Sequence, residues 1–352
     1  LQFLPSLLHA SIKKEHGMHQ CILVATSGDT GGAALAGFAN IPHTSCLVFF
    51  PKGGVSPLQK AQMQSAQGDN LQTIEFEGDF DDLQMAMKAI FADSTFLDSL
   101  EKRFKTHISS ANSINFGRLL PQVFYPFAAY GQMLRSGEIK PGELINIVIP
   151  TGNFGDMFAA LIAKEMGCPL GKLICATNAN SATAELIETG IFSLQGKKTK
   201  KTLSPAMDIS RASNIERLLF WASNENANQV QSWQNDLLKT GEFTLDDASF
   251  AKIQKYFSAV SISDEETKIS IQEVFQERKY LLDPHTAVGY AAWKKKKGKR
   301  KSLLFSTAHY AKFGKTVFEA LFPEKPCPKT EQEILVALQK VAQKPHLPQK
   351  FF

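Results

Sequence analysis

Short apolar runs alternate with helical segments along most of this chain, and this alternation constrains its fold more than any other feature. Residues 21–25 have the pattern of a buried strand, and an Ala-rich helical segment follows to Ala39. The further predicted strands cover 47–50, 71–76, 144–149, 173–176 and 303–305, and the further predicted helices cover 56–67, 81–91 and a segment that ends at residue 164. Strands that alternate with helices are typical of an α/β protein with mostly parallel sheets.

The rest of the chain is predicted to be mainly helical. Between about residues 210 and 280 the sequence indicates almost only helix, and one amphipathic helix is expected after Pro328. The first residues also have a helical pattern, whose apolar face consists of Leu1, Leu4, Leu8 and Ile12. A chain of 352 residues with 43% hydrophobic content is long enough for two domains.

The distribution of charge argues against a nucleic-acid-binding protein. The chain has 39 Lys and Arg against 34 Asp and Glu, which gives a net charge of +5. Seven basic residues lie in one run at 294–301, so the rest of the chain is close to neutral. We interpret this run as a solvated helix end and the smaller cluster at 197–201 as a solvated loop. No nucleic-acid partner is expected.

The cysteines and the length of the apolar runs favour a cytoplasmic protein. The five cysteines are scattered without the spacing of metal ligands, and Cys21, Cys46 and Cys175 lie in strand-like runs. Cysteine in such runs is usually a small buried hydrophobe. No apolar stretch reaches the roughly 18 residues that a membrane span needs, and the first residues do not form a signal peptide. We therefore expect no metal and no membrane partner.

A loop rich in glycine and small polar residues follows the first predicted strand. T-S-G-D-T-G-G at 26–32 ends this strand and opens a helix. Ligands of parallel α/β sheets bind at the carboxyl ends of strands, and helix N-termini offer free N–H groups to anions. The loop is therefore a candidate anion site. Its glycine spacing is not G-x-G-x-x-G, so the dinucleotide fingerprint is absent.

A second loop has the same design. G-N-F-G-D at 152–156 follows the strand predicted at 144–149 and also opens a helix. No G-x-x-x-x-G-K-[ST] motif occurs, which argues against a P-loop ATPase. Either loop alone could be an ordinary turn that needs glycine for a positive φ. Two together favour two anionic groups, or one phosphorylated ligand with an anionic partner.

Three further segments place polar residues before helices. Asn112, Ser113 and Arg118 could bind a phosphate, although the first two also suit a helix N-cap and Arg118 a surface ion pair. S-P-A-M-D-I at 204–209 predicts only a turn before a helix. S-T-A-H at 306–309 carries hydroxyls that could bond a heterocycle nitrogen or cap the next helix.

Taken in order, these segments resemble the threonine synthase family. The matching stretches are T-S-G-D-T-G-G at 26–32, P-K-G-G-V-S-P-L-Q at 51–59, A-N-S-I-N-F-G-R-L-L-P-Q at 111–122, P-T-G-N-F-G-D at 150–156, S-P-A-M-D-I at 204–209 and S-T-A-H at 306–309. The resemblance implies a tryptophan-synthase-β-like pyridoxal-phosphate enzyme of fold type II, with two α/β domains and mostly parallel sheets. We expect a smaller domain at 1–120, and a larger one at 121–352 with the cofactor-phosphate loop and a helical insertion at 210–280.

The resemblance also implies roles for individual residues. Asp29 would lie beside the 3-hydroxyl of the cofactor, and Thr307 would meet its pyridine nitrogen. The loop implied to hold the cofactor phosphate consists of Gly152, Asn153, Phe154, Gly155 and Asp156. The residues implied to hold the phosphate or carboxylate of the substrate are Thr26, Ser27, Thr30, Asn112, Ser113, Arg118 and Asn153.

The implied activity is a pyridoxal 5'-phosphate-dependent β,γ-replacement in threonine biosynthesis. It converts O-phospho-L-homoserine and water into L-threonine and phosphate, and the implied enzyme is a carbon–oxygen lyase that works as a monomer or homodimer. His309 is followed by Tyr310 where the family has proline, a departure that affects only local backbone shape. The F-K-D motif that carries the cofactor lysine of the family has no match in this chain. We therefore expect the chain as printed to lack its Schiff-base lysine and to be inactive or unstable alone.

Two alternative functions stay open. One is a pyridoxal-phosphate-dependent hydroxyamino-acid dehydratase, against which a dedicated phosphate site argues. The other is a non-catalytic relative that binds phosphorylated ligands. The start at Leu1 without a methionine favours a truncated enzyme over this second alternative.

Overall fold

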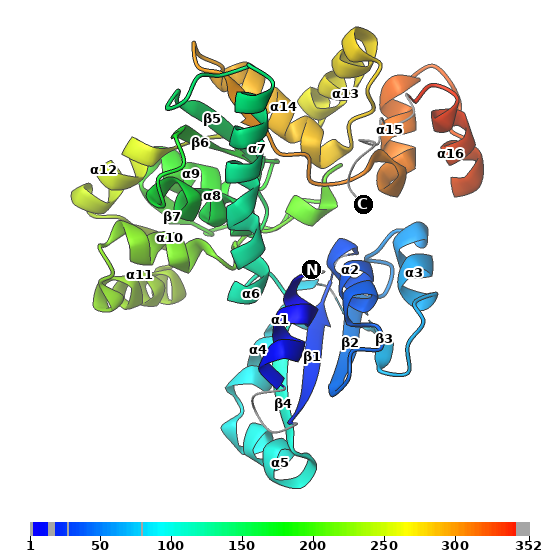
Figure 1. Ribbon diagram of the computed structural model, residues 1–352, viewed down its shortest axis with the longest axis vertical. Helices are drawn as coiled ribbons and strands as arrows, with labels where there is room; N and C mark the ends of the chain where they lie inside the picture. The colour runs from blue at the N-terminus through cyan, green and yellow to red at the C-terminus, as the bar shows by residue number, and fades with distance from the viewer. Residues whose placement is uncertain (1–2, 13–17, 27, 79, 343–352) are drawn as a thin grey trace. The chain divides into compact units, whose positions relative to one another are not determined.

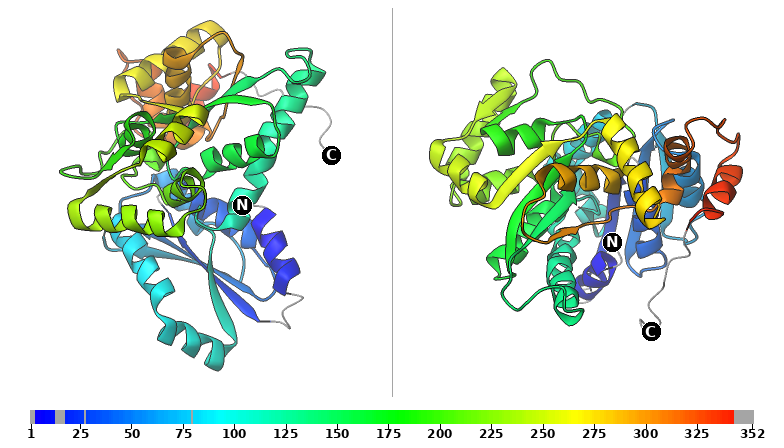
Figure 2. Two further views of the ribbon diagram at one scale, coloured as in Figure 1. Left: turned by 90° about the vertical axis from the view of Figure 1, so that its left-hand side faces the viewer. Right: turned by 90° about the horizontal axis from the view of Figure 1, so that it is seen from above.

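Parallel strands, each followed by helices, form the framework of the protein. The structure is a computed structural model that describes residues 3–12, 18–26, 28–78 and 80–342 (Figures 1 and 2). It divides into two compact units, which consist of Leu1–Pro141 with Asn153–Cys168, and of Gly142–Gly152 with Pro169–Phe352. The domain boundary predicted at residue 120 stays a prediction, and packing within the chain groups residues 121–141 with the first unit.

The first unit is built on a four-stranded parallel sheet in the order β3-β2-β1-β4. Its strands are β1 (His19–Ala25), β2 (Thr44–Pro51), β3 (Leu71–Phe76) and β4 (Thr106–Ser110). Its helices are α1 (Phe3–Ile12), α2 (Asp29–Phe38), α3 (Pro57–Gln64), α4 (Phe80–Ala92), α5 (Ser94–Phe104), α6 (Phe116–Leu119), the 3-10 helix η1 (Leu120–Val123), α7 (Phe124–Arg135) and α8 (Gly155–Glu165).

Side chains alternate between the two faces of this sheet, and a different helix packs on each face. Val24 and Val48 pack with Leu35 of α2 in one buried cluster. Leu23 and its neighbours pack with Leu83 of α4 in another. This is the arrangement expected of a parallel sheet, which is buried on both faces.

The second unit has a four-stranded parallel sheet in the order β10-β5-β6-β9 and a small antiparallel pair, β7 with β8. Its strands are β5 (Ile145–Pro150), β6 (Leu170–Thr177), β7 (Ile191–Ser193), β8 (Glu242–Thr244), β9 (Phe257–Ser261) and β10 (Ser302–Leu304). Its helices are α9 (Ala182–Thr189), η2 (Pro205–Met207), α10 (Ile215–Ala222), α11 (Ala227–Thr240), α12 (Asp247–Tyr256), α13 (Asp264–Arg278), α14 (Pro284–Lys296), η3 (Tyr310–Phe313), α15 (Gly314–Leu321) and α16 (Glu331–Gln339). Val148 of β5 and Ile174 of β6 pack with Val288 of α14 in the core of this unit.

The α/β class with parallel sheets is confirmed, but the prediction of almost only helix over 210–280 is wrong. The strand β9 lies between α12 and α13 and pairs in parallel with β6. Its five residues are too few to interrupt the helical pattern on either side in the sequence. Phe257 and Ala259 are buried on one side of the strand, and the N–H of Ala259 donates to Oε1 of Glu188 at 2.5 Å. Burial therefore makes this segment a strand.

The basic run lies at a helix end, as expected. Lys294, Lys295 and Lys296 form the last turn of α14. Lys294 and Lys295 pair with Glu273 and Glu266 of α13 at 2.5 Å. The amphipathic helix predicted after Pro328 is confirmed as α16, which begins with a capping box at Thr330. Among the described residues, no helix is both long and apolar enough to cross a membrane.

Candidate functional site

The order of the first sheet brings two of the predicted loops to one edge. In the order β3-β2-β1-β4, the direction of the connections reverses between β1 and β4. Such a switch point is where open α/β sheets bind ligands, because the loops at the carboxyl ends of the two strands diverge there. The loop that starts at Thr26 follows β1, and the segment with Asn112 and Ser113 follows β4.

The side chain of Asn112 ties these two loops together. Its Nδ2 donates to the carbonyl oxygen of Ala25 at 2.6 Å, and its Oδ1 accepts from the N–H of Ala25 at 3.0 Å. The amide thus pairs with β1 as a neighbouring backbone would. Ser113 is the next residue along the chain and is partly buried. The structure therefore gives Asn112 a scaffolding contact, while its predicted role toward substrate stays a prediction.

Thr26 shapes the turn into α2. Its side chain is buried, and its Oγ1 accepts from the N–H groups of Gly28 and Gly31 at 2.9 and 3.0 Å. Gly28 has φ of +138°, a conformation that L side chains rarely adopt. Thr30 lies in the first turn of α2 and is partly buried. Ser27, the remaining predicted residue of this loop, lies outside the described residues.

The segment at 51–59 supports the same turn from α3. Nε2 of Gln59 donates to Oδ1 of Asp29 at 3.0 Å. Oε1 of Gln59 accepts from the N–H of Ser56 at 3.0 Å, as one half of a capping box at the start of α3. A Cβ on Gly28 would lie 2.4 Å from the Gln59 side chain. Gln59 therefore explains why the motifs at 26–32 and 51–59 occur together.

Arg118 and Asp156 bring opposite charges near each other in the first unit. Nη1 of Arg118 donates to the carbonyl oxygen of Ala111 at 3.0 Å. Burial lowers the pKa of Arg118, and the Asp156 carboxylate acts in the opposite direction. Burial also raises the pKa of Asp156, and Arg118 works against that shift. An arginine that lies beside a sheet edge and has donors without acceptors is a suitable phosphate ligand.

The start of α8 carries the loop predicted to hold an anion. Phe154 is its N-cap residue, with φ of +64° and no side-chain capping bond. Asn153 precedes it, and Gly155 and Asp156 form the first turn. The side chain of Phe154 therefore supplies no acceptor to the first N–H groups of α8. Together with the helix dipole, they form an N-terminus suited to an anion.

The second sheet has a switch point of its own, between β5 and β10. Gly152 follows β5 and Thr307 follows β10, so both predicted residues lie at carboxyl ends of neighbouring strands. A Cβ on Gly152 would lie 2.8 Å from the carbonyl oxygen of Ala206, so only glycine allows this approach. Thr307 is exposed, and its N–H donates to Oγ1 of Thr286 at 3.2 Å.

The group that supports this second switch point was not predicted from the sequence. Asp283 caps α14 and accepts from the N–H groups of His285 and Thr286 at 2.9 and 3.3 Å. It also accepts from Nδ1 of His285 at 3.0 Å and from the hydroxyl of Thr286. With its proton on Nδ1, His285 accepts the N–H of Ala206 on Nε2 at 3.2 Å. A Pro that follows an Asp N-cap at 283–284 was the available sequence signal for this helix start.

The segment at 204–209 is also held by a carboxylate. Oδ1 of Asp208 accepts from Nδ2 of Asn178 at 2.8 Å and from Oγ1 of Thr202 at 2.7 Å. Burial raises the pKa of Asp208, and these bonds work against the shift. The predicted turn is confirmed as η2, and it lies against Gly152 through Ala206 and Met207.

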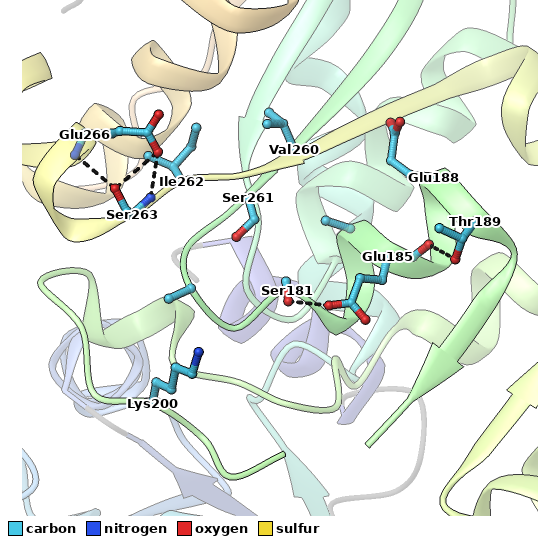
Figure 3. Close-up of a pocket in the computed structure, with 12 residues that line it drawn as sticks. Ser181, Glu185, Glu188, Thr189, Lys200, Val260, Ser261, Ile262, Ser263 and Glu266 are labelled. Atoms are coloured by element: carbon cyan, nitrogen blue, oxygen red, sulfur yellow. Dashed lines mark hydrogen bonds between the residues drawn. The ribbon is translucent and has the colours of Figure 1, made fainter. Parts of the chain in front are cut away.

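A cavity of about 590 Å³ lies elsewhere in the second unit, between α9 and the segment from β9 to α13 (Figure 3). None of the predicted site residues lines it. Its carboxylates already have partners, because Glu185 accepts from Ser181 at 2.6 Å and Glu266 pairs with Lys295 at 2.5 Å. It is therefore not a candidate for the predicted anion sites. The described residues contain no cluster of three or more side chains suited to a metal ion.

Comparison with known proteins gives the family. Residues 4–304 match the model of the pyridoxal-phosphate dependent enzymes. Threonine synthase-like 1 of Pongo abelii is 41% identical over 306 residues, which are 85% of this chain and 41% of that protein. The chain thus spans about two fifths of the length of this curated relative. Threonine synthase of Pseudomonas aeruginosa is 36% identical over 332 residues, which are 93% of this chain and 67% of that protein.

A solved structure supports the same assignment. The pyridoxal-phosphate-bound threonine synthase of Brucella melitensis has a TM-score of 0.82 and 35% identity, and the match covers 97% of this chain and 74% of that one. This confirms the predicted fold type II architecture and pyridoxal phosphate as the cofactor of the family. The chain therefore belongs to the pyridoxal-phosphate dependent enzymes and, within them, to the threonine synthases and threonine synthase-like proteins.

Proposed function

We propose that the protein converts O-phospho-L-homoserine and water into L-threonine and phosphate. The observation that carries this proposal is the switch point of the first sheet, where Thr26 and Asn112 fix two loops and Arg118 retains unsaturated donors near them. A substrate with a phosphate at one end and an amino-acid carboxylate at the other matches such a site. The reaction would take place in the cytoplasm, by a monomer or homodimer.

The residues present fit pyridoxal phosphate. The start of α8 offers backbone N–H groups that the side chain of Phe154 does not cap. Because Gly152 has no side chain, the backbone there can lie close to the carbonyl oxygen of Ala206. We assign the phosphate of the cofactor to the backbone from Gly152 to Asp156. When bound, the cofactor supplies an electron sink for negative charge that develops on substrate carbons.

Other residues of the chain would orient the cofactor ring. Asp29 would lie beside the 3-hydroxyl, since Gln59 already holds its carboxylate in place. Thr307 would meet the pyridine nitrogen, because its side chain is exposed at the end of β10. A neutral hydroxyl at that nitrogen suits an electron sink that is not fully protonated.

The substrate would be held by donors of the first unit. Arg118 and Ser113 would take its phosphate, and the turn that contains Thr26, Ser27 and Thr30 would take its carboxylate with help from Asn112 and Asn153. Arg118 would also stabilise the phosphate as it departs, since a fixed cation is most effective where charge develops.

The test is the release of phosphate and the formation of threonine from O-phosphohomoserine with added pyridoxal phosphate. We would compare the chain as printed with one extended upstream through its reading frame. We expect the extended form to produce threonine and phosphate in equal amounts and the printed chain to be silent. A pyridoxyl adduct on one specific lysine of the printed chain after borohydride reduction would contradict the expectation about the lysine.

The alternatives predict different results. A dehydratase would deaminate an unphosphorylated hydroxyamino acid, and Arg118→Ala would leave that activity intact. A non-catalytic relative would bind phosphorylated ligands without turnover in either form. Turnover of O-phosphohomoserine that depends on Arg118 would exclude both.

A further inference from the structure

A buried carboxyl oxygen without a hydrogen-bond partner among the described residues belongs to a side chain near Arg118. Asp156 stands in the first turn of α8, and its Oδ1 is buried with no hydrogen-bond partner among the described residues. Helix α8 packs against α6, which carries Arg118, and against η1 and α7. A buried carboxylate oxygen that accepts no bond is unusual, because the cost of its desolvation is not offset.

Arg118 also has hydrogen-bond donors without acceptors among the described residues. In the described part of the chain, its guanidinium makes one hydrogen bond, from Nη1 to Ala111. Its Nε and Nη2 donors are therefore left for a ligand. The pair thus combines donors that lack acceptors with an acceptor that lacks a donor, and both belong to the first unit.

Few other charges act on Asp156. Of the titratable side chains on the elements packed against α8, Arg118 on α6 and Tyr125 on α7 interact with it electrostatically. Burial raises the pKa of Tyr125, and Asp156 adds to that shift, so the phenol is neutral near pH 7. The segment η1 carries no titratable residue. The protonation of Asp156 is therefore decided by its burial, by Arg118, by the cofactor phosphate that we assign to the backbone of this loop, and by any ion that Arg118 binds.

A phosphate dianion on Arg118 would change that balance. Two negative charges near a buried carboxylate raise the pKa of the carboxyl, because like charges disfavour the ionised form. Burial has already moved the pKa of Asp156 in the same direction. Once protonated, the carboxyl carries an O–H, which can donate to a phosphate oxygen.

We propose that Asp156 takes up one proton when a phosphate group binds Arg118, and that the neutral carboxyl then donates a hydrogen bond to that phosphate. This proposal rests on the proposed function, which makes Arg118 a ligand of the substrate phosphate. It adds Asp156 as a second ligand of that phosphate and couples phosphate binding to the uptake of a proton. Asp156 would then serve through its side chain as well as through its backbone N–H.

The test is calorimetric titration of the protein, with pyridoxal phosphate bound, by sulfate. Sulfate has the shape and charge of a phosphate dianion but does not titrate near neutral pH, so any proton taken up goes to the protein or to its bound cofactor, and an Asp156 variant tells the two apart. Binding heats in two buffers of different ionisation enthalpy give the number of protons. At pH values where Asp156 is ionised in the free protein, we expect about one proton per sulfate and an affinity that falls by about tenfold per pH unit.

Two variants sharpen the test. Asp156→Asn should bind sulfate without proton uptake, with an affinity that no longer depends on pH. Glu165→Gln removes an equal charge from the exposed end of the same helix and should behave as the wild type. If Asp156→Asn does not fold, Asp156→Ser takes its place, and a wild type that takes up no proton overturns the proposal in either case.

The outcomes separate this proposal from the one it rests on. Sulfate binding that weakens at least tenfold in Arg118→Gln but takes up no proton in the wild type overturns the role of Asp156 and leaves that of Arg118. Absence of any sulfate binding that depends on Arg118 overturns both.

Discussion

Each of the two units has a largely buried aspartate at a helix start, Asp156 in the first and Asp283 in the second, but the two aspartates are in opposite states. Asp283 accepts hydrogen bonds from two N–H groups, an imidazole and a hydroxyl, and these hold its pKa below the usual range despite burial. Oδ1 of Asp156 accepts none within the described residues, and burial raises the pKa of Asp156. The hydrogen-bonded carboxylate of Asp283 serves the fold, whereas Oδ1 of Asp156 lacks such partners among the described residues.

The neighbours of the two aspartates differ in the same way. His285 uses both ring nitrogens, one toward Asp283 and one toward Ala206, and it is buried against Phe313 at 4.6 Å between ring centroids. Arg118 uses one donor of its guanidinium. The second switch point is therefore a rigid support, and the first carries the donors that a substrate would need.

The largest expected effect is on catalysis at the first switch point. In the form of the protein that turns over O-phosphohomoserine, Arg118→Ala should lower kcat/KM by about a hundredfold to a thousandfold, as loss of a donor to developing charge does elsewhere. The bound amount of pyridoxal phosphate, measured by its absorbance, should stay unchanged. Arg217→Ala serves as a control, since this arginine belongs to the second unit and bonds Asn214 at 3.0 Å. Equal losses in both variants would mean that Arg118 acts through the fold.

The second effect concerns the stability of the second switch point. Asp283→Ala removes a helix cap and leaves His285 and Thr286 without their acceptor, so the free energy of unfolding should fall by about 3 kcal/mol. Because the folded pKa of Asp283 is depressed, this contribution is complete above its ordinary value of 3.8 and is lost as pH falls through the folded pKa. The difference from wild type should therefore shrink in acid.

Urea unfolding at neutral and acidic pH measures this difference. Asp246→Ala removes an exposed cap of α12 and should cost only about 1 kcal/mol. If both variants lose the same stability, the buried bonds of Asp283 contribute nothing beyond a cap.

The contrast between the two switch points also explains what the sequence could predict. The polar residues of the first one lie on the loops or in the short helix α6 that follows one of them, so Thr26, Asn112 and Arg118 were visible as motifs. The supports of the second come from Asp283 and His285, which lie more than a hundred residues after the loop at Gly152. Such partners meet only through the sheet order, which no local pattern contains. The strand β9 was missed for a similar reason, because pairing with β6 and burial define it.

The same limit applied to the chemistry of individual side chains. The position of Asp156 in a motif predicted that it belongs to a phosphate loop, but whether its oxygen has a partner depends on how α6 and α7 pack on α8. Likewise, Gln59 was part of a matching stretch without a role until its bond to Asp29 was seen.

A third, smaller effect is expected from alanine substitution of the two glycines Gly152 and Gly28. In Gly152→Ala the added Cβ would lie 2.8 Å from a backbone carbonyl oxygen, which cannot move away cheaply. In Gly28→Ala it would meet the Gln59 side chain, which can rotate, although φ of +138° adds strain. We expect Gly152→Ala to weaken binding of pyridoxal phosphate by at least about tenfold and to cost about 2 kcal/mol of stability.

Fluorescence titration of the cofactor and thermal unfolding measure the two effects. Gly28→Ala should weaken cofactor binding by no more than about threefold, since Asp29 is the one residue of its loop that we assign to the cofactor, and the others are assigned to the substrate. The opposite ranking would mean that the loop of the first switch point holds the cofactor phosphate.

The smallest effect has the opposite sign and separates the two aspartates most sharply. Because the folded pKa of Asp156 is raised, the stability of the wild type falls as pH rises from 3.8 through the folded pKa, where the buried carboxyl must ionise. Asp156→Asn escapes this cost, so it should be more stable than wild type by about 1 kcal/mol above neutral pH and no more stable in acid. Urea unfolding of the wild type and of Asp156→Asn at pH 5 and pH 8, with Glu165→Gln as the control, measures how this difference in stability changes with pH. If Asp156→Asn is instead less stable at pH 8, Arg118 stabilises the ionised carboxylate of Asp156 in the free protein. Asp156 and Asp283 would then both be carboxylates whose ionised form the fold stabilises.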